Sequence, residues 1–72
     1  MRGSPHWIVK ALRAERRLQG ISQSKIGEIA GYAPTHISAL ETGHQGARIE
    51  IICDLAEALG LEIKLVERSN DK

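Results

Sequence analysis

Bulky aromatic side chains are nearly absent from this chain of 72 residues, which contains no Phe, one Trp and one Tyr. Its apolar residues are mostly Ile, Leu and Ala, a set typical of a helical core and unlike that of a β-sandwich or β-barrel. A domain of this length buries a modest core and is often marginally stable alone. We therefore expect an all-α domain, and we expect self-association to add to its stability.

Cysteine and long apolar runs are also scarce. Cys53 is the only cysteine in the sequence, which excludes an internal disulfide and a cysteine-based zinc site and fits a reducing compartment. No apolar run approaches the roughly 18 residues of a membrane span, and the first residues lack the hydrophobic stretch of a signal peptide. These absences predict a soluble, cytoplasmic protein with no membrane partner.

The sequence contains no catalytic or cofactor-binding motif. His6, His36 and His44 are not spaced four residues apart, and neither H-E-x-x-H nor C-x-x-C occurs. The G-H-Q-G run at residues 43–46 lacks the Lys and the following Ser or Thr of a phosphate-binding loop. We expect no enzyme activity, no metal site and no cofactor.

Charge is unevenly distributed along the chain. Residues 1–48 contain seven Lys or Arg and three Glu, a net charge of +4, whereas residues 49–72 contain three basic and six acidic residues, a net charge of −3. A basic half and an acidic half are expected of a nucleic-acid reader with a single working surface. Ordinary scatter of surface charge explains the same counts, so charge alone does not decide the partner.

Two short amphipathic patterns flank a glycine between residues 20 and 43. Ile26, Ala30, Ile37 and Leu40 recur at helical spacings, and polar residues alternate with them. Gly31 lies between the two patterns, where glycine reaches without strain the left-handed conformation that ends a helix. The stretch predicts two helices joined by a tight turn.

The ends of these two helices are marked unequally. Ser22 is a good N-cap for the first helix, and Pro34 is preorganised for the first turn of the second. Ala33 offers no capping oxygen, which predicts a second helix less stable by about 0.5–2 kcal/mol. Gly27 lies mid-helix, where glycine costs roughly 1 kcal/mol relative to Ala, so we expect a close helix crossing near Ile37 to compensate.

A dense set of short motifs runs through this stretch: I-S-Q at 21–23, I-G at 26–27, A-G-Y at 30–32, I-S at 37–38 and E-T-G at 41–43. These motifs resemble those of the phage-repressor or Xre-type helix-turn-helix family, whose usual pattern is LSQ..LA...GVS...IS..E.G. With the flanking helices, the resemblance covers roughly residues 8–61. It implies a four- to five-helix, phage-repressor-like helix-turn-helix domain that binds double-stranded DNA and regulates transcription.

The resemblance places the DNA-reading surface on the second motif helix, residues 34–42. It also implies that Gln23, at the start of the first motif helix, contacts the DNA backbone or an adjacent base. The glycine-rich loop from Gly43 to Ala47 lies where amides and side chains can reach phosphates, although a plain helix connector is the competing interpretation. The expected DNA-contacting residues are Gln23, Pro34, Thr35, His36, Ser38, Ala39, His44, Gln45 and Arg48.

The reading helix has no Arg or Lys that could form paired hydrogen bonds with guanine. Thr35 and Ser38 can bond several bases, whereas Pro34 and Ala39 suit thymine methyl groups. We therefore expect specificity to depend more on DNA shape and on dimer spacing than on paired base contacts. Further phosphate candidates, each equally well explained as a solvated side chain, are Arg13, Arg17 and Lys25.

Helices are also expected on both sides of the motif, over His6–Leu18 and Arg48–Leu59. Trp7 in the first of them is predicted to be a core or dimer-edge residue. In the resembled family an Arg of the first helix pairs with the Glu that ends the reading helix, here Arg16 and Glu41, and two solvated side chains are the alternative. The apolar face of the last helix, with Cys53 as a buried structural thiol, is expected to contain Ile49, Ile52, Cys53, Leu55, Ala56 and Leu59.

After Gly60 the apolar period changes from 3.6 to two. Leu61, Ile63 and Leu65 alternate with their neighbours, which predicts a short β-strand, while a fifth helix stays open as the alternative. A lone strand needs a partner for its backbone groups, and a second copy of the chain is the simplest one. The ending A-L-G-L-E-I-K-L-V is also similar to that of HipB-like and HigA-like antitoxin regulators.

The sequence thus predicts a flexible leader over residues 1–5, a helix-turn-helix domain over 6–60, a dimerisation segment over 61–67 and a flexible tail over 68–72. The leading hypothesis is a homodimeric repressor that places its two reading helices in successive major grooves of a palindromic operator. The alternative is an antitoxin that neutralises a protein toxin and autoregulates its own operon. A third hypothesis is an interaction bundle that does not bind DNA.

Overall fold

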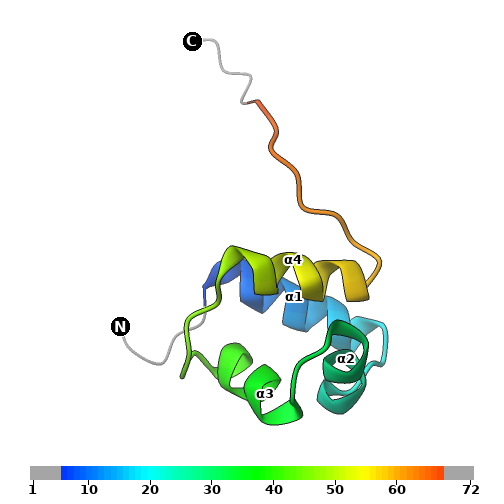
Figure 1. Cartoon of the computed structure of the whole chain (residues 1–72). Coiled ribbons are helices and arrows are strands. Elements are labelled where there is room, and N and C mark those ends of the chain that lie inside the picture. The colour runs from blue at the N-terminus through cyan, green and yellow to red at the C-terminus, as the bar shows by residue number, and fades with distance from the viewer. Residues whose placement is uncertain (1–5, 68–72) are drawn as a thin grey trace.

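The computed structural model describes residues 6–67 and contains four helices (Figure 1). They are α1 (Trp7–Leu18), α2 (Gln23–Ala30), α3 (Pro34–Thr42) and α4 (Ile49–Ala58). α1 packs against α3 and α4, and α2 packs against the same two helices. The all-α prediction is confirmed for the described residues, whereas the predicted leader and the predicted tail over 68–72 lie outside them.

All four helices contribute to one hydrophobic core. Its two most deeply buried large side chains, Ile37 and Leu40, both belong to α3, so the inward face of α3 fixes the direction of its outward face. Ile26 is also buried and Ala30 is half-buried, which confirms the inward positions predicted for the two motif helices. The full core consists of Val9, Leu12, Ile26, Ile37, Leu40, Ile52, Leu55, Ala56 and Leu59.

The turn between α2 and α3 is closed by the backbone. Gly31 is left-handed, with φ of 90°, and its N–H donates to the carbonyl of Gly27 at 2.7 Å. The N–H of Tyr32 donates to the same carbonyl at 2.8 Å. A Cβ on Gly27 would collide with the carbonyl oxygen of Tyr32, whereas it would meet Ile37 at an ordinary 3.5 Å. The turn, and not the crossing predicted near Ile37, therefore requires glycine at position 27.

The two motif helices are capped as unequally as the sequence predicts. Ser22 Oγ accepts a hydrogen bond from the backbone N–H of Lys25 at 3.0 Å. Ala33 makes no side-chain cap bond, and Pro34 stands in the first turn of α3. The start of α3 therefore depends on proline and on packing.

Three predictions about the flanking helices need correction. α1 begins at Trp7, because His6 is its N-cap, and α4 is one residue shorter at each end than Arg48–Leu59. Cys53 is exposed, and Ile49 keeps 63% of its surface exposed. The inward stripe of α4 is Ile52, Leu55 and Ala56, and the C-cap residue Leu59 continues it. A residue next to Ile52 is rotated about 100° away from it.

The first helix also presents apolar side chains to solvent. Trp7 is 70% exposed and Leu18 is 81% exposed, whereas Val9 and Leu12 of the same helix are buried. Placing Trp7 in the core was therefore wrong, and its role at a dimer edge stays a prediction.

Residues 61–67 form neither a helix nor a strand, and every one of them is exposed. The N–H of Leu61 donates to the carbonyl of Ala56 in α4 at 2.8 Å, and Figure 1 shows the rest of the segment leading away from the end of α4. The fifth helix is thus not observed in the described part of the chain. Pairing of this segment between two copies stays a prediction, because a strand ladder requires the second copy.

Candidate DNA-contacting surface

The outward face of α3 starts at its first turn. Pro34 and Thr35 are exposed, and Ser38 and Ala39 are half-buried, so these four predicted residues occupy the accessible side of the helix. The 9-residue helix contains no charged side chain other than Glu41, which points into the domain and is buried. α3 therefore presents a small, neutral polar face that can approach a groove without a charge penalty.

His36, the fifth residue predicted on this face, is placed differently. Its ring lies edge-on against Tyr32 with centroids 5.4 Å apart, and its Nε2 atom is buried without a hydrogen-bond partner among the described residues. Together with Gln45 and Arg48, it lines a shallow depression of about 500 Å³ between the starts of α3 and α4. Three of the predicted contact residues thus gather in one concave surface, with Glu50 at its edge.

Tyr32 anchors this depression to α4. Its hydroxyl donates to Asp54 at 2.5 Å, a contact that the sequence analysis did not predict. That hydrogen bond, together with burial and the charges of Asp54 and Glu50, raises the pKa of Tyr32 above 10.0. Tyr32 therefore stays neutral near pH 7 and ties the turn before α3 to the last helix.

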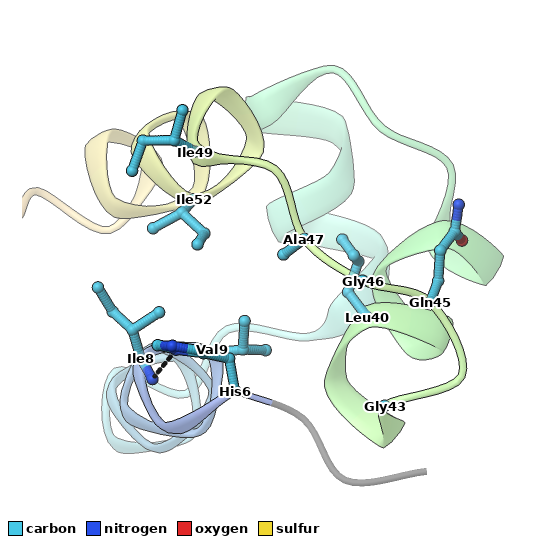
Figure 2. Close-up of a pocket in the computed structure, with 10 residues that line it drawn as sticks. All are labelled: His6, Ile8, Val9, Leu40, Gly43, Gln45, Gly46, Ala47, Ile49 and Ile52. Carbon is cyan, nitrogen blue, oxygen red and sulfur yellow. Dashed lines mark hydrogen bonds between the residues drawn. The ribbon is translucent and has the colours of Figure 1, made fainter. Parts of the chain in front are cut away.

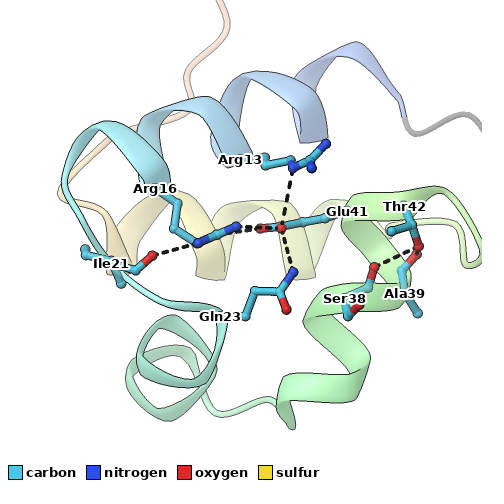
Figure 3. Close-up of polar contacts among 8 residues, drawn as sticks. All are labelled: Arg13, Arg16, Ile21, Gln23, Ser38, Ala39, Glu41 and Thr42. Atoms are coloured by element: carbon cyan, nitrogen blue, oxygen red, sulfur yellow. Dashed lines mark hydrogen bonds and ion pairs between the residues drawn. The ribbon is translucent and has the colours of Figure 1, made fainter.

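An ion pair holds α3 against α1 (Figure 3). Arg16 Nε donates to Glu41 at 2.7 Å, and a second guanidinium nitrogen donates to the other carboxylate oxygen at 2.9 Å. The third nitrogen donates to the carbonyl of Ile21 at 2.7 Å. Both charged side chains are less than a tenth exposed. This paired geometry fixes the orientation of α3 more strictly than apolar packing alone.

Gln23 joins the same cluster. Its Nε2 donates to Glu41 at 3.0 Å, so the amide nitrogen predicted to contact DNA is engaged inside the domain, while the residue stays half-buried. Figure 3 shows the Gln23 side chain directed at the Glu41 carboxylate, together with Arg13 and Arg16. Gln23 therefore links the start of α2 to the end of α3, a role that the sequence motif alone does not predict.

The Glu41 carboxylate is held in its charged form. Burial works to raise its pKa, but hydrogen bonds from Arg16 and Gln23 and the charges of Arg16 and Arg13 outweigh burial, and the net effect lowers the pKa below 4.5. Arg13 approaches the same carboxylate at 3.8 Å with its side chain partly exposed. The cluster of Arg13, Arg16, Gln23 and Glu41 thus stays ionised at neutral pH. Its two arginines and one carboxylate give it a net charge of +1, and the partly exposed Arg13 places this charge toward the surface.

The loop after α3 is tied back to the helix that precedes it. The backbone N–H groups of His44 and Gln45 both donate to the carbonyl of Ala39, at 2.9 and 3.3 Å. The Thr42 hydroxyl bonds the carbonyl of Ser38 at 2.8 Å and lies 2.8 Å from His44 Nδ1. His44 is therefore positioned beside α3, and Thr42, which is exposed, belongs to this surface although it is not among the residues predicted from the sequence.

Basic side chains flank α3 rather than occupy it. Lys10, Arg13 and Arg17 recur three and four residues apart on one side of α1, the side from which Arg13 reaches Glu41 of α3. Arg48 is exposed at the start of α4. Cations on both sides of a neutral reading face suit phosphates on both sides of a groove.

A second concave region lies behind the loop (Figure 2). It has a volume of about 590 Å³ and opens between the starts of α1 and α4. Most of its lining is apolar, with Ile8 and Ile49 near its rim and Leu40 at its base. Within residues 6–67, no group of three or more His, Cys, Asp or Glu side chains could hold a metal ion, and no helix is long and apolar enough to cross a bilayer.

Two short helices joined by a glycine turn, with the second helix buried on one face and open on the other, define the helix-turn-helix class of domain. The family model described as Helix-turn-helix matches residues 12–66. The chain belongs to the helix-turn-helix family.

The chain is also similar to a curated protein called "Uncharacterized HTH-type transcriptional regulator y4dL", from Sinorhizobium fredii (strain NBRC 101917 / NGR234). The two are 36% identical over 61 residues, which cover 85% of this chain and 31% of the relative. The chain thus spans about a third of the length of this curated relative.

Proposed function

We propose that this chain is a sequence-specific DNA-binding transcriptional regulator that acts as a homodimeric repressor on a palindromic operator. The proposal is carried by one observation: α3 is locked in place by a buried inward face and by the Arg16–Glu41 pair, while Thr35 and its outward neighbours stay accessible. Membership in the helix-turn-helix family supports this use of α3. The similarity to a protein named as a transcriptional regulator supports the same class of function.

The proposal assigns base contacts to α3 and phosphate contacts to the residues beside it. Thr35, Ser38 and Ala39 approach base edges in the major groove, where hydroxyl groups bond several bases and a methyl group contacts thymine. Arg48 and Gln45 contact phosphates from the depression beside α3. Because no guanidinium or ammonium group lies on α3, shape and spacing of the operator contribute a large share of specificity.

The homodimer supplies the second half of the recognition. Two reading helices separated by about 34 Å fit successive major grooves of a palindrome. The exposed segment 61–67, with its alternating apolar residues, is available to pair with the same segment of a second copy.

The test is a selection of bound fragments from random DNA at controlled salt, followed by anisotropy titrations on the best sequence. Thr35→Ala and Ser38→Ala are expected to weaken specific binding about three- to tenfold, since each removes one hydrogen bond, and Arg48→Ala is expected to lower the salt slope by about one. The matched control is Cys53→Ser, a neutral change at an exposed position of α4. If Thr35→Ala, Ser38→Ala and Arg48→Ala all bind like the native chain and like the Cys53→Ser control, the surface is assigned wrongly.

A further inference from the structure

α1 has a second apolar stripe on the side opposite its core face. Val9, Leu12 and Arg16 point inward and are buried. Four other residues, spaced four, three and four apart, lie about half a turn away from them. All four are exposed, and in order they are Trp7, Ala11, Ala14 and Leu18.

From this stripe we propose that the outward face of α1 is the contact between two copies of this chain, packed antiparallel around a twofold axis. The stripe reads large, small, small, large, and it is symmetric about the middle of the helix. Antiparallel pairing places Trp7 opposite Leu18 of the second copy and Ala11 opposite Ala14. The small central residues let the two helix backbones approach, and the large end residues pack over them, which makes the surface complementary to itself. This inference rests on the homodimer in the proposed function.

The same twofold axis suits DNA binding. A twofold axis that relates two antiparallel helices lies perpendicular to both helix axes, between the helices. The same flank of each helix therefore faces the same side of the dimer. The basic flank of α1, with Lys10, Arg13 and Arg17, lies toward α3, so both copies of α3 would face one side of the dimer, as a DNA reader requires. Lys10 and Arg17 of the two copies would then lie near each other, so added salt is expected to strengthen self-association.

Buried area indicates that α1 does not complete the interface alone. Trp7, at 70% exposure, offers on the order of 150 Å². Leu18, at 81% exposure, adds further apolar area, and the two alanines add little. A standard stable interface buries roughly 800 Å² per partner. The remaining area is expected from segment 61–67, where Leu65 is fully exposed and Val66 is 78% exposed.

The test uses the full chain and its single tryptophan. Sedimentation equilibrium and Trp7 emission are measured over a concentration series without DNA, and Trp7 emission is expected to shift to shorter wavelength as the dimer forms. Ala11→Glu and Ala14→Glu are expected to weaken association at least about tenfold, because a carboxylate in an apolar contact costs more than the 1.4 kcal/mol that tenfold represents. Both positions are exposed, so the monomer should fold normally by circular dichroism.

Two further variants separate this interface from other arrangements. Ser24→Glu introduces the same charge at an exposed position of α2 and is expected to leave association unchanged. Leu65→Glu reports the contribution of the C-terminal segment. A native monomer at every concentration overturns the proposal, as does a dimer that Leu65→Glu dissociates while both α1 variants leave it intact.

A cross-linking experiment tests the antiparallel register directly. Chains with Ala11→Cys and chains with Ala14→Cys, both carrying Cys53→Ser, are mixed and oxidised. Opposed positions fall within disulfide range, whereas identical positions are offset along the axis, so the mixed disulfide is expected to dominate over either symmetric one. Equal or lower yield of the mixed product contradicts the register. DNA binding is measured separately, because loss of specific binding with an intact α1 dimer contradicts the proposed function and leaves this interface standing.

Discussion

Removal of either partner of the Arg16–Glu41 pair is expected to destabilise the domain severely. The two side chains share two hydrogen bonds of 2.7 and 2.9 Å and are both less than a tenth exposed. A single replacement such as Glu41→Leu leaves a buried guanidinium without its counter-charge, which costs about 3–5 kcal/mol. A chain of 72 residues is expected to have a total unfolding free energy of about 4–11 kcal/mol. One substitution therefore removes a large fraction of the stability.

The double replacement Arg16→Met with Glu41→Leu should behave differently. It removes both charges together and fills the space with apolar atoms, so its cost should fall well below that of either single change. The double variant still leaves the carbonyl of Ile21 without its donor from Arg16, and the amide of Gln23 and the guanidinium of Arg13 without Glu41. The difference between the double variant and the sum of the single variants gives the coupling energy of the pair.

The assay is urea unfolding followed by far-ultraviolet circular dichroism, at one fixed protein concentration so that association does not change between variants. The matched control is the exposed Lys25–Glu28 pair, whose charges are 3.8 Å apart. Lys25→Ala should change the unfolding free energy by no more than about 0.5–1 kcal/mol. Single replacements at Arg16 or Glu41 that cost as little as Lys25→Ala would refute the argument that this pair fixes α3.

Three further changes test the account of the fold. Gly27→Ala should destabilise the domain by about 1–3 kcal/mol despite the better helix propensity of Ala, because the new Cβ meets the carbonyl of Tyr32; equal or greater stability in thermal unfolding would show that the turn can yield. Ala33→Ser should stabilise the domain by about 0.5–2 kcal/mol by supplying the missing cap of α3, and a lower melting temperature would contradict this. Folding lowers the pKa of Glu41, so the ionised carboxylate stabilises the folded state above about pH 4.5, and this stabilisation is lost as the pH falls through the lower pKa of the folded state. Urea unfolding measured from pH 7 to 3 should show the loss. The variant Glu41→Gln should lack this pH-dependent contribution.

The sequence predicts the elements of this fold well because its local signals agree. Ser22, Gly31 and Pro34 mark the ends of the two motif helices, and the structure places a cap, a left-handed turn and a helix start at these positions. Periodicity is less decisive where a helix has apolar residues on two sides. α1 is such a helix, and the sequence alone does not show whether Trp7 or Val9 faces the core.

Contacts between distant residues account for most of what the sequence could not predict. Cys53 and Ile52 are neighbours of similar hydrophobicity, and only the packing of α4 against α1 and α2 decides that Ile52 is inside. The motif gives no sign that Gln23 has a partner within the domain, but its side-chain amide donates a hydrogen bond to Glu41 in the structure. The hydrogen bond from Tyr32 to Asp54 leaves no mark in the sequence, because neither residue type requires the other.

The most direct test of the central claim is a titration of the isotope-labelled chain with a selected DNA duplex, followed by backbone amide chemical shifts. The account predicts that the largest shifts occur at residues 35–39 of α3 and at residues 43–48 of the following loop, with small shifts at the end of α4. Shifts concentrated on α4, with Thr35 and Ser38 unaffected at saturation, would contradict it.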